Sequence, residues 1–130
     1  MKFQKWVLTY YAVLFTLFGI TGFLFPEQTS QLIHYEFKNN IAKMEFSSTY
    51  GGLFIGIGLF MFYCLKTNIH TGLICVLVTM GTMFITRTFA YLTYNEIDLI
   101  QYIYLSGELF TLFLIAYLIA FKPLRFNRAV

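Results

Sequence analysis

Four long apolar runs constrain this chain more than any other feature of its sequence. They cover residues 6–25, 46–65, 71–94 and 99–121. Each has about 20 residues or slightly more, and a helix of that length, rising about 1.5 Å per residue, can cross a bilayer core roughly 30 Å thick. The sequence therefore predicts an all-α membrane protein, in which residues 1–130 form one domain of four transmembrane helices.

The composition excludes an ordinary soluble domain. Hydrophobic residues make up 58% of the chain and charged residues only 12%, whereas soluble domains carry about 25% charged residues. A small domain has too much surface for its volume to hide so many apolar side chains from water. No cleavage site follows Phe25, so we expect the first run to be a retained anchor and not a signal peptide.

The connections between the runs are residues 26–45, 66–70 and 95–98. The last two are so short that the helices they join must be antiparallel neighbours, which predicts an antiparallel four-helix bundle. Six basic residues lie on the side of the termini and two on the opposite side. The positive-inside rule then places both termini in the cytoplasm. These charges are spread over segment ends and form no basic stripe, which argues against nucleic-acid binding.

The first connection contains four apolar residues at helical spacing among polar neighbours, namely Ile33, Phe37, Ile41 and Met44. This pattern predicts a short interfacial helix on the outer membrane surface between the first and second spans. Asn40 is the residue type that caps helix starts, and we expect it to cap the helix that becomes the second span.

Two charged residues lie well inside apolar runs: Arg87 in the third and Glu108 in the fourth. Counted from the outer ends, they lie roughly 10 Å and 14 Å deep, so their side chains can meet. Each charge costs about 2.5 to 3.5 kcal/mol at a helix centre when it faces lipid. We therefore expect the two residues to pair inside the bundle, with Glu45 at the outer end of the second span pointing into the same region.

Polar and small residues recur at spacings of three and four on each run, which predicts an inward polar face. From these faces we take as candidate ligand-binding residues Glu45, Thr49, Arg87, Tyr91, Gln101, Tyr104 and Glu108. Two interpretations stay open. The Arg87–Glu108 pair can be purely structural and fix the helix register, or it can belong to an outward-opening, water-accessible pocket for a polar headgroup or a proton.

Small residues predict where helices approach closely. The first span carries a stripe of small side chains, Thr9, Ala12, Thr16 and Gly19, and the second contains Gly52 and Gly56 at GxxxG spacing. Such residues let transmembrane helices pack backbone to backbone.

Metal and cofactor chemistry has little support in the sequence. His34 and His70 fall in connections on opposite membrane faces, so they cannot ligate one haem together or complete a catalytic triad. Cys64 and Cys75 lack metal-binding spacing and are expected to be small packing groups. We therefore expect no catalytic residue, no metal and no cofactor.

A resemblance rests on the order of several short motifs: Phe25-Pro26-Glu27, Glu45, Tyr50-Gly51-Gly52-Leu53, Gly56-x-Gly58, Arg87 and Glu108. In this order the chain resembles a family of small bacterial four-helix membrane proteins catalogued as a domain of unknown function. The resemblance implies four helices and a bacterial inner membrane. It implies no substrate, cofactor or catalytic residue.

Three functional hypotheses follow. The leading one is an inner-membrane protein whose outer pocket, built by Glu45, Arg87 and Glu108, binds a small amphiphile such as a lipid or quinone headgroup. The second is an accessory or assembly subunit, or a homo-oligomer, in which the polar cluster serves folding alone. The third, a proton-coupled carrier or membrane enzyme, is disfavoured because the chain shows only a weak internal repeat and no catalytic set.

Overall fold

The computed structural model describes residues 2–94 and 98–121, and these residues contain helices and connections but no strand. The helices follow the chain as α1 (Lys2–Leu24), α2 (Pro26–Gln31), α3 (Asn40–Phe46), the π-helix η1 (Ser47–Gly52), α4 (Leu53–Thr67), α5 (Ile69–Tyr94) and α6 (Leu99–Phe121). Since α3, η1 and α4 are continuous, four helices are long and apolar enough to cross a membrane. The predicted all-helical class and the four spans are confirmed at this level.

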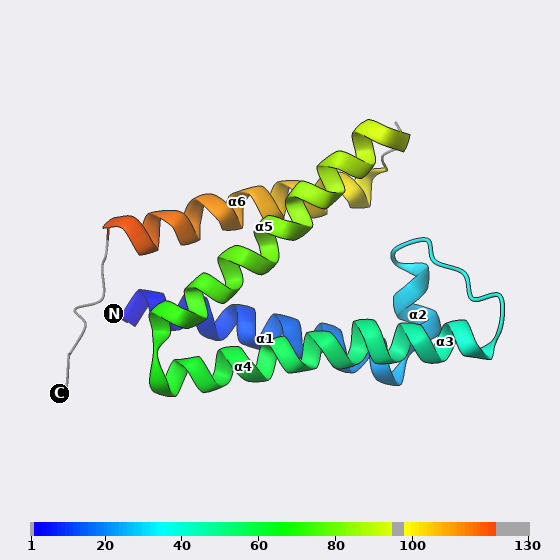
Figure 1. Cartoon of the computed structure of the whole chain (residues 1–130), viewed down its shortest axis with the longest axis horizontal. Coiled ribbons are helices and arrows are strands. Elements are labelled where there is room, and N and C mark those ends of the chain that lie inside the picture. Colours follow the sequence, from blue (N-terminus) through cyan, green and yellow to red (C-terminus); the bar gives the residue numbers. More distant parts are fainter. Residues whose placement is uncertain (1, 95–97, 122–130) are drawn as a thin grey trace.

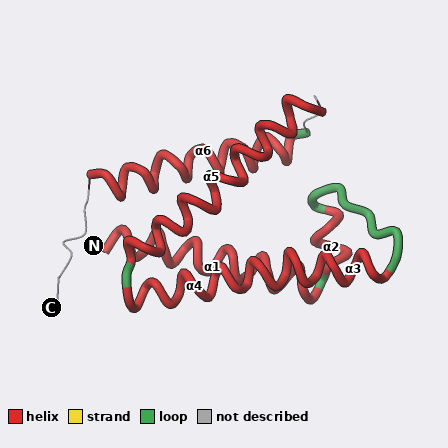
Figure 2. The backbone as a smooth tube through the Cα atoms, viewed as in Figure 1, coloured by secondary structure: helices red, strands yellow, loops and turns green. Residues whose placement is uncertain are grey.

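The long helices form two pairs (Figure 1). One pair is α1 with α3–η1–α4, and the other is α5 with α6. The pairs lie together where α4 turns into α5 and diverge toward the end that carries α2 and α3, as the tube in Figure 2 also shows. We call residues 2–15, 58–80 and 111–121 the closed half, and residues 16–57, 81–94 and 98–110 the open half.

The buried members of the main hydrophobic cluster all lie in the closed half, while Phe54 and Ile57 of the open half pack against it and Phe46 is buried apart from it. The buried members of this cluster come from all four long helices: Val7, Leu8, Tyr11, Ala12, Phe15, Met61, Cys64, Ile69, Leu73, Val76, Met80, Ile115 and Leu118. No described residue of α5 beyond Met80 is buried, and Glu108 is the first buried residue of α6. The four helices therefore share a core at one end of the molecule only.

Glycines bring α1 and α4 into backbone contact. A Cβ atom added to Gly19 would lie 2.5 Å from the Ile55 nitrogen, and one added to Gly58 would lie 2.8 Å from the Thr16 nitrogen. The predicted small stripe on the first span thus packs as expected through Thr16 and Gly19. Gly52 and Gly56 do not pack against a helix within the described chain, because a Cβ atom at either position would meet nothing within 4 Å.

The second span packs on α1 through a different pair of glycines. Gly51 and Gly58, which flank the end of η1 and the start of α4, are the glycines that face α1. Every residue of the expected inward face of the second span is exposed instead: Glu45, Ser48, Thr49, Gly52 and Gly56.

The first connection differs from the single helix that periodicity predicted. Residues 32–39 are turns and extended chain between α2 and α3, so Ile33 and Phe37 lie outside any helix. His34 has a φ of 55°, in the left-handed region that interrupts helices. The helix cap is Asn39 and not Asn40, since the Asn39 Oδ1 atom accepts a hydrogen bond from the Ala42 nitrogen at 2.8 Å. The capping residue type was right and its position wrong by one.

Candidate ligand-binding site

An ion pair joins α5 to α6 in the open half. The Nη2 atom of Arg87 on α5 lies 3.0 Å from the Oε1 atom of Glu108 on α6. The Nε atom of Arg87 also donates to Oε1 at 3.1 Å and to Oε2 at 3.3 Å. The Glu108 side chain is 6% exposed and that of Arg87 26%. The expected pairing of these residues is therefore present, and the arginine is the more exposed of the two side chains.

Two further candidates from α6 complete the surroundings of the guanidinium. The Nη1 atom of Arg87 donates to the Gln101 Oε1 atom at 2.6 Å. The Tyr104 ring lies against the guanidinium, with the Cζ atom 5.3 Å from the ring centroid, a distance at which cation–π attraction operates. Gln101, Tyr104 and Glu108 follow one another at spacings of three and four, so one face of α6 supplies all three.

The charged pair sits where the helix pairs begin to diverge. Two hydrogen bonds join α1 to α6 below it: one between the hydroxyls of Tyr11 and Thr111 at 2.6 Å, and one from Gln4 Nε2 to the Leu118 carbonyl at 3.2 Å. Thr111 lies one helical turn from Glu108 on the same face. Glu108 therefore lies on the side of α6 that turns toward α1, directly beyond the shared core.

Polar contacts continue from this cluster to the first connection. The Asp98 Oδ1 atom accepts from the Gln101 nitrogen at 2.8 Å and so caps the start of α6. Its other oxygen lies 2.6 Å from the Nε2 atom of His34, which joins the first connection to the second helix pair. The Gln101 backbone N–H and, next to it, the His34 ring lower the pKa of the Asp98 carboxyl.

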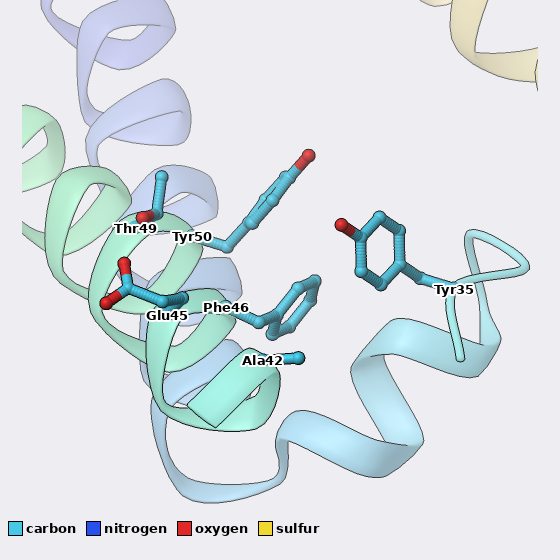
Figure 3. Close-up of a pocket in the computed structure, with 6 residues that line it drawn as sticks. All are labelled: Tyr35, Ala42, Glu45, Phe46, Thr49 and Tyr50. Carbon is cyan, nitrogen blue, oxygen red and sulfur yellow. The ribbon is translucent and has the colours of Figure 1, made fainter. Parts of the chain in front are cut away.

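Glu45 and Thr49 lie elsewhere. They line a hollow of about 250 Å³ together with Tyr35, Ala42, Phe46 and Tyr50. Figure 3 shows both side chains on one side of the helix, while the rings of Phe46 and Tyr50 point the other way, toward Tyr35. Among the described residues no hydrogen bond or ion pair links Glu45 to Arg87 or Glu108. The expected three-residue cluster is thus corrected to a pair, because the second span belongs to the helix pair that diverges from α5 and α6.

Tyr91 follows Arg87 by one turn on α5 and is partly exposed. Within the described residues Tyr91 forms no hydrogen bond with Arg87, Gln101, Tyr104 or Glu108. Of the seven candidates, four come together as one group, which we call the Arg87 cluster: Arg87, Gln101, Tyr104 and Glu108.

A row of aromatic rings was missed by the sequence analysis. Phe46 stacks on Tyr50 with centroids 4.6 Å apart, and Phe54 stacks on Phe15 with centroids 5.4 Å apart. Residues 46, 50 and 54 follow one another at a spacing of four, which puts their side chains on one helix face. That spacing was the available signal, but an excess of aromatic residues along the whole chain hid it.

No group of three or more His, Cys, Asp or Glu residues within 2–94 and 98–121 could hold a metal ion. Cys64 is buried and Cys75 partly buried, and both are free thiols. The chemistry of the Arg87 cluster is therefore that of charge pairing and hydrogen bonding: it presents N–H donors, carboxylate and amide oxygens and one aromatic face.

A family model matches residues 3–119, and its description is Domain of unknown function (DUF4345). The match covers most of the chain, so the chain belongs to this family, and the resemblance found in the sequence is confirmed. No curated protein matches the chain, and no solved structure matches it.

Proposed function

We propose that the chain is a multi-pass protein of the bacterial inner membrane, an antiparallel bundle with cytoplasmic termini whose open half binds the headgroup of a small uncharged amphiphile. One observation carries the proposal: a charge pair joins α5 to α6 in the open half, beyond the core that the four helices share, and its arginine is only partly covered. Ionisable groups at membrane depth are expensive, and they usually mark a functional site.

The charge balance of the cluster favours a neutral ligand. Arg87 and Glu108 sum to zero, and Gln101 and Tyr104 add hydrogen-bonding capacity without net charge. An anionic headgroup at Arg87 would lie close to the Glu108 carboxylate, and like charges repel strongly where the dielectric constant is low. A lipid or quinone whose polar end is uncharged avoids this penalty.

The packing of the open half supports entry from the lipid. Beyond Met80 no described residue of α5 is buried, and large apolar side chains such as Ile85 and Phe89 are 66% and 71% exposed. In a bilayer these faces contact lipid tails. A lipid-soluble molecule can therefore reach the Arg87 cluster sideways without first crossing a packed core.

A second candidate function has its own observation. The face of η1 and α4 that carries Ser48, Gly52 and Gly56 is exposed, and nothing lies within 4 Å of a Cβ atom added to either glycine. Small residues at this spacing favour contact with another transmembrane helix. This favours the accessory-subunit or homo-oligomer hypothesis, with the Arg87 cluster serving structure alone.

Native mass spectrometry of the protein extracted in mild detergent tests both candidates. The proposal predicts a retained amphiphile on the wild-type chain and its loss in Glu108→Gln. Glu45→Gln is the matched control, because it neutralises a carboxylate of the outer region that lies apart from the cluster, and it should retain the amphiphile. A stoichiometric protein partner with no retained amphiphile would reject the binding function in favour of the subunit function.

A further inference from the structure

We infer that Arg87 binds a carbonyl oxygen of the ligand. The guanidinium N–H groups that Glu108 and Gln101 do not engage donate to an uncharged C=O group of the bound amphiphile. The inference rests on the proposed function and adds the chemical class of the ligand. It follows from a count of donors, from how the guanidinium is held, and from the charge beside it.

The donor count comes first. A guanidinium has five N–H groups. Glu108 accepts from the Nε–H and forms an ion pair with Nη2 at 3.0 Å, and one hydrogen of Nη1 is donated to Gln101. Nη1 and Nη2 therefore each keep at least one N–H for which the described part of the chain supplies no acceptor. In the bilayer interior no bulk water meets such groups, so an acceptor brought by a ligand is favourable.

The guanidinium is also held in place before any ligand arrives. Glu108 fixes one edge, Gln101 fixes Nη1, and the Tyr104 ring lies 5.3 Å from the Cζ atom. Because the group is planar, its remaining N–H bonds point outward in the same plane. The side chain is 26% exposed while its carboxylate partner is 6% exposed, so the uncovered part of the pair is the donor side. A fixed donor loses less entropy on binding than a mobile one.

The neighbouring carboxylate selects the acceptor. A phosphate or a free fatty-acid carboxylate would bring negative charge next to Glu108. An ester or quinone carbonyl oxygen has two lone pairs and no net charge, so it can accept from Arg87 without this repulsion. Quinones and neutral glycerolipids both carry such an oxygen at the polar end of the molecule, where the apolar tail begins.

The test measures the contact directly in the unaltered protein. Wild-type chain with ¹⁵N-labelled arginine, held in dodecyl maltoside micelles that contain no carbonyl group, is frozen with ¹³C-carbonyl decylubiquinone in one arm and with ¹³C-carbonyl dioleoylglycerol in the other. Solid-state dipolar recoupling between ¹⁵Nη and ¹³C reports their proximity. We expect dephasing in the arm that supplies the natural class of ligand, and its loss in Arg87→Lys, which keeps the charge but lacks the planar fork. Glu45→Gln should keep it.

The outcomes separate the inference from the proposed function. Binding of either amphiphile without ¹⁵N–¹³C dephasing would overturn the carbonyl contact and leave amphiphile binding standing. Dephasing that persists in Arg87→Lys would also overturn it, because the contact would then belong to another arginine. If neither amphiphile binds, and an anionic lipid such as phosphatidylglycerol shows ³¹P proximity to the arginine nitrogens, the inference fails and so does the proposal of an uncharged ligand.

Discussion

The closed and open halves of this protein are built from the same four long helices but are held together in different ways. In the closed half, side chains from every long helix meet in one apolar core. In the open half, α5 and α6 are joined to each other by the Arg87–Glu108 pair, and to the first connection by the contact of His34 with Asp98. A core shared by all four long helices therefore stabilises one end of the molecule, and at the other end a small number of polar contacts join α5 to α6 and to the first connection.

This difference indicates that the two halves serve different purposes, helix association in one and access for a ligand in the other. Transmembrane helices gain little from the hydrophobic effect alone, since lipid tails are as apolar as the core, and they associate through close packing and hydrogen bonds. In the closed half all four long helices pack closely, whereas in the open half close packing joins only α1 to η1 and α4, at Gly19 and Gly51. The open half leaves α5 and α6 free of a shared core with α1 and α4, and it is where polar groups remain available to a ligand.

The largest effect is expected from breaking the ion pair that organises the open half. Removing one partner of a buried pair typically costs roughly 3 to 5 kcal/mol, because the other charge is left alone. Arg87→Met and Glu108→Gln should each destabilise the protein by several kcal/mol, and the double variant should cost less than the sum. Unfolding in mixed micelles measures the cycle. Strict additivity would show that the residues do not interact.

A pair of truncations on one helix compares the two halves next. Leu73 on α5 is fully buried in the closed half, and Ile85 on the same helix is 66% exposed in the open half. Leu73→Ala should destabilise the protein by about 2 to 5 kcal/mol, because it leaves a cavity. Ile85→Ala should stay within about 0.5 kcal/mol, as exposed positions do. Equal losses for the two variants would mean that the open half has a packed core after all.

Glycines of α4 give a smaller, local comparison. Gly58 faces the Thr16 backbone, whereas a Cβ atom at Gly56 meets nothing within 4 Å. Gly58→Val should cost about 1 to 3 kcal/mol through overpacking against α1, and Gly56→Val should leave stability nearly unchanged. Since both substitutions alter the same helix by the same side chain, the difference isolates the α1–α4 contact. A larger loss for Gly56→Val would reverse the assignment of faces.

The smallest effect concerns the polar contact at the outer end. Because the pKa of Asp98 is lowered in the folded protein, chiefly by the Gln101 N–H, its contribution is present above the pKa of the unfolded chain and is lost as the pH falls through the lower folded value. The protection of the backbone amides of residues 32–38, which is the exchange rate relative to the intrinsic rate at the same pH, should therefore fall at acid pH. Asp98→Asn should show the lower protection already at neutral pH. Protection in this segment that changes neither at acid pH nor in Asp98→Asn would mean that Asp98 does not hold the first connection in place.

The four spans were predictable because apolar length is a local property, and the meeting of Arg87 with Glu108 was predictable because a four-residue connection forces two spans to share depth. The position of Glu45 away from this pair was not predictable, because it depends on how far the two helix pairs diverge. Likewise, the sequence did not show that Gly51 and Gly58 face α1 while Gly52 and Gly56 do not, because that depends on how the two helices pack. Nor does any periodicity reveal the contact between His34 and Asp98, which are 64 residues apart.

The central claim is that the Arg87 cluster binds a ligand and is more than a structural pair. Native mass spectrometry of the Arg87→Met, Glu108→Gln double variant tests it most directly, because this variant removes both charges and so leaves neither one unpaired. The account predicts a folded chain of partly restored stability that retains no amphiphile, beside a wild-type chain that does. A double variant that retains the amphiphile as fully as the wild type would contradict the account and leave the pair a purely structural one.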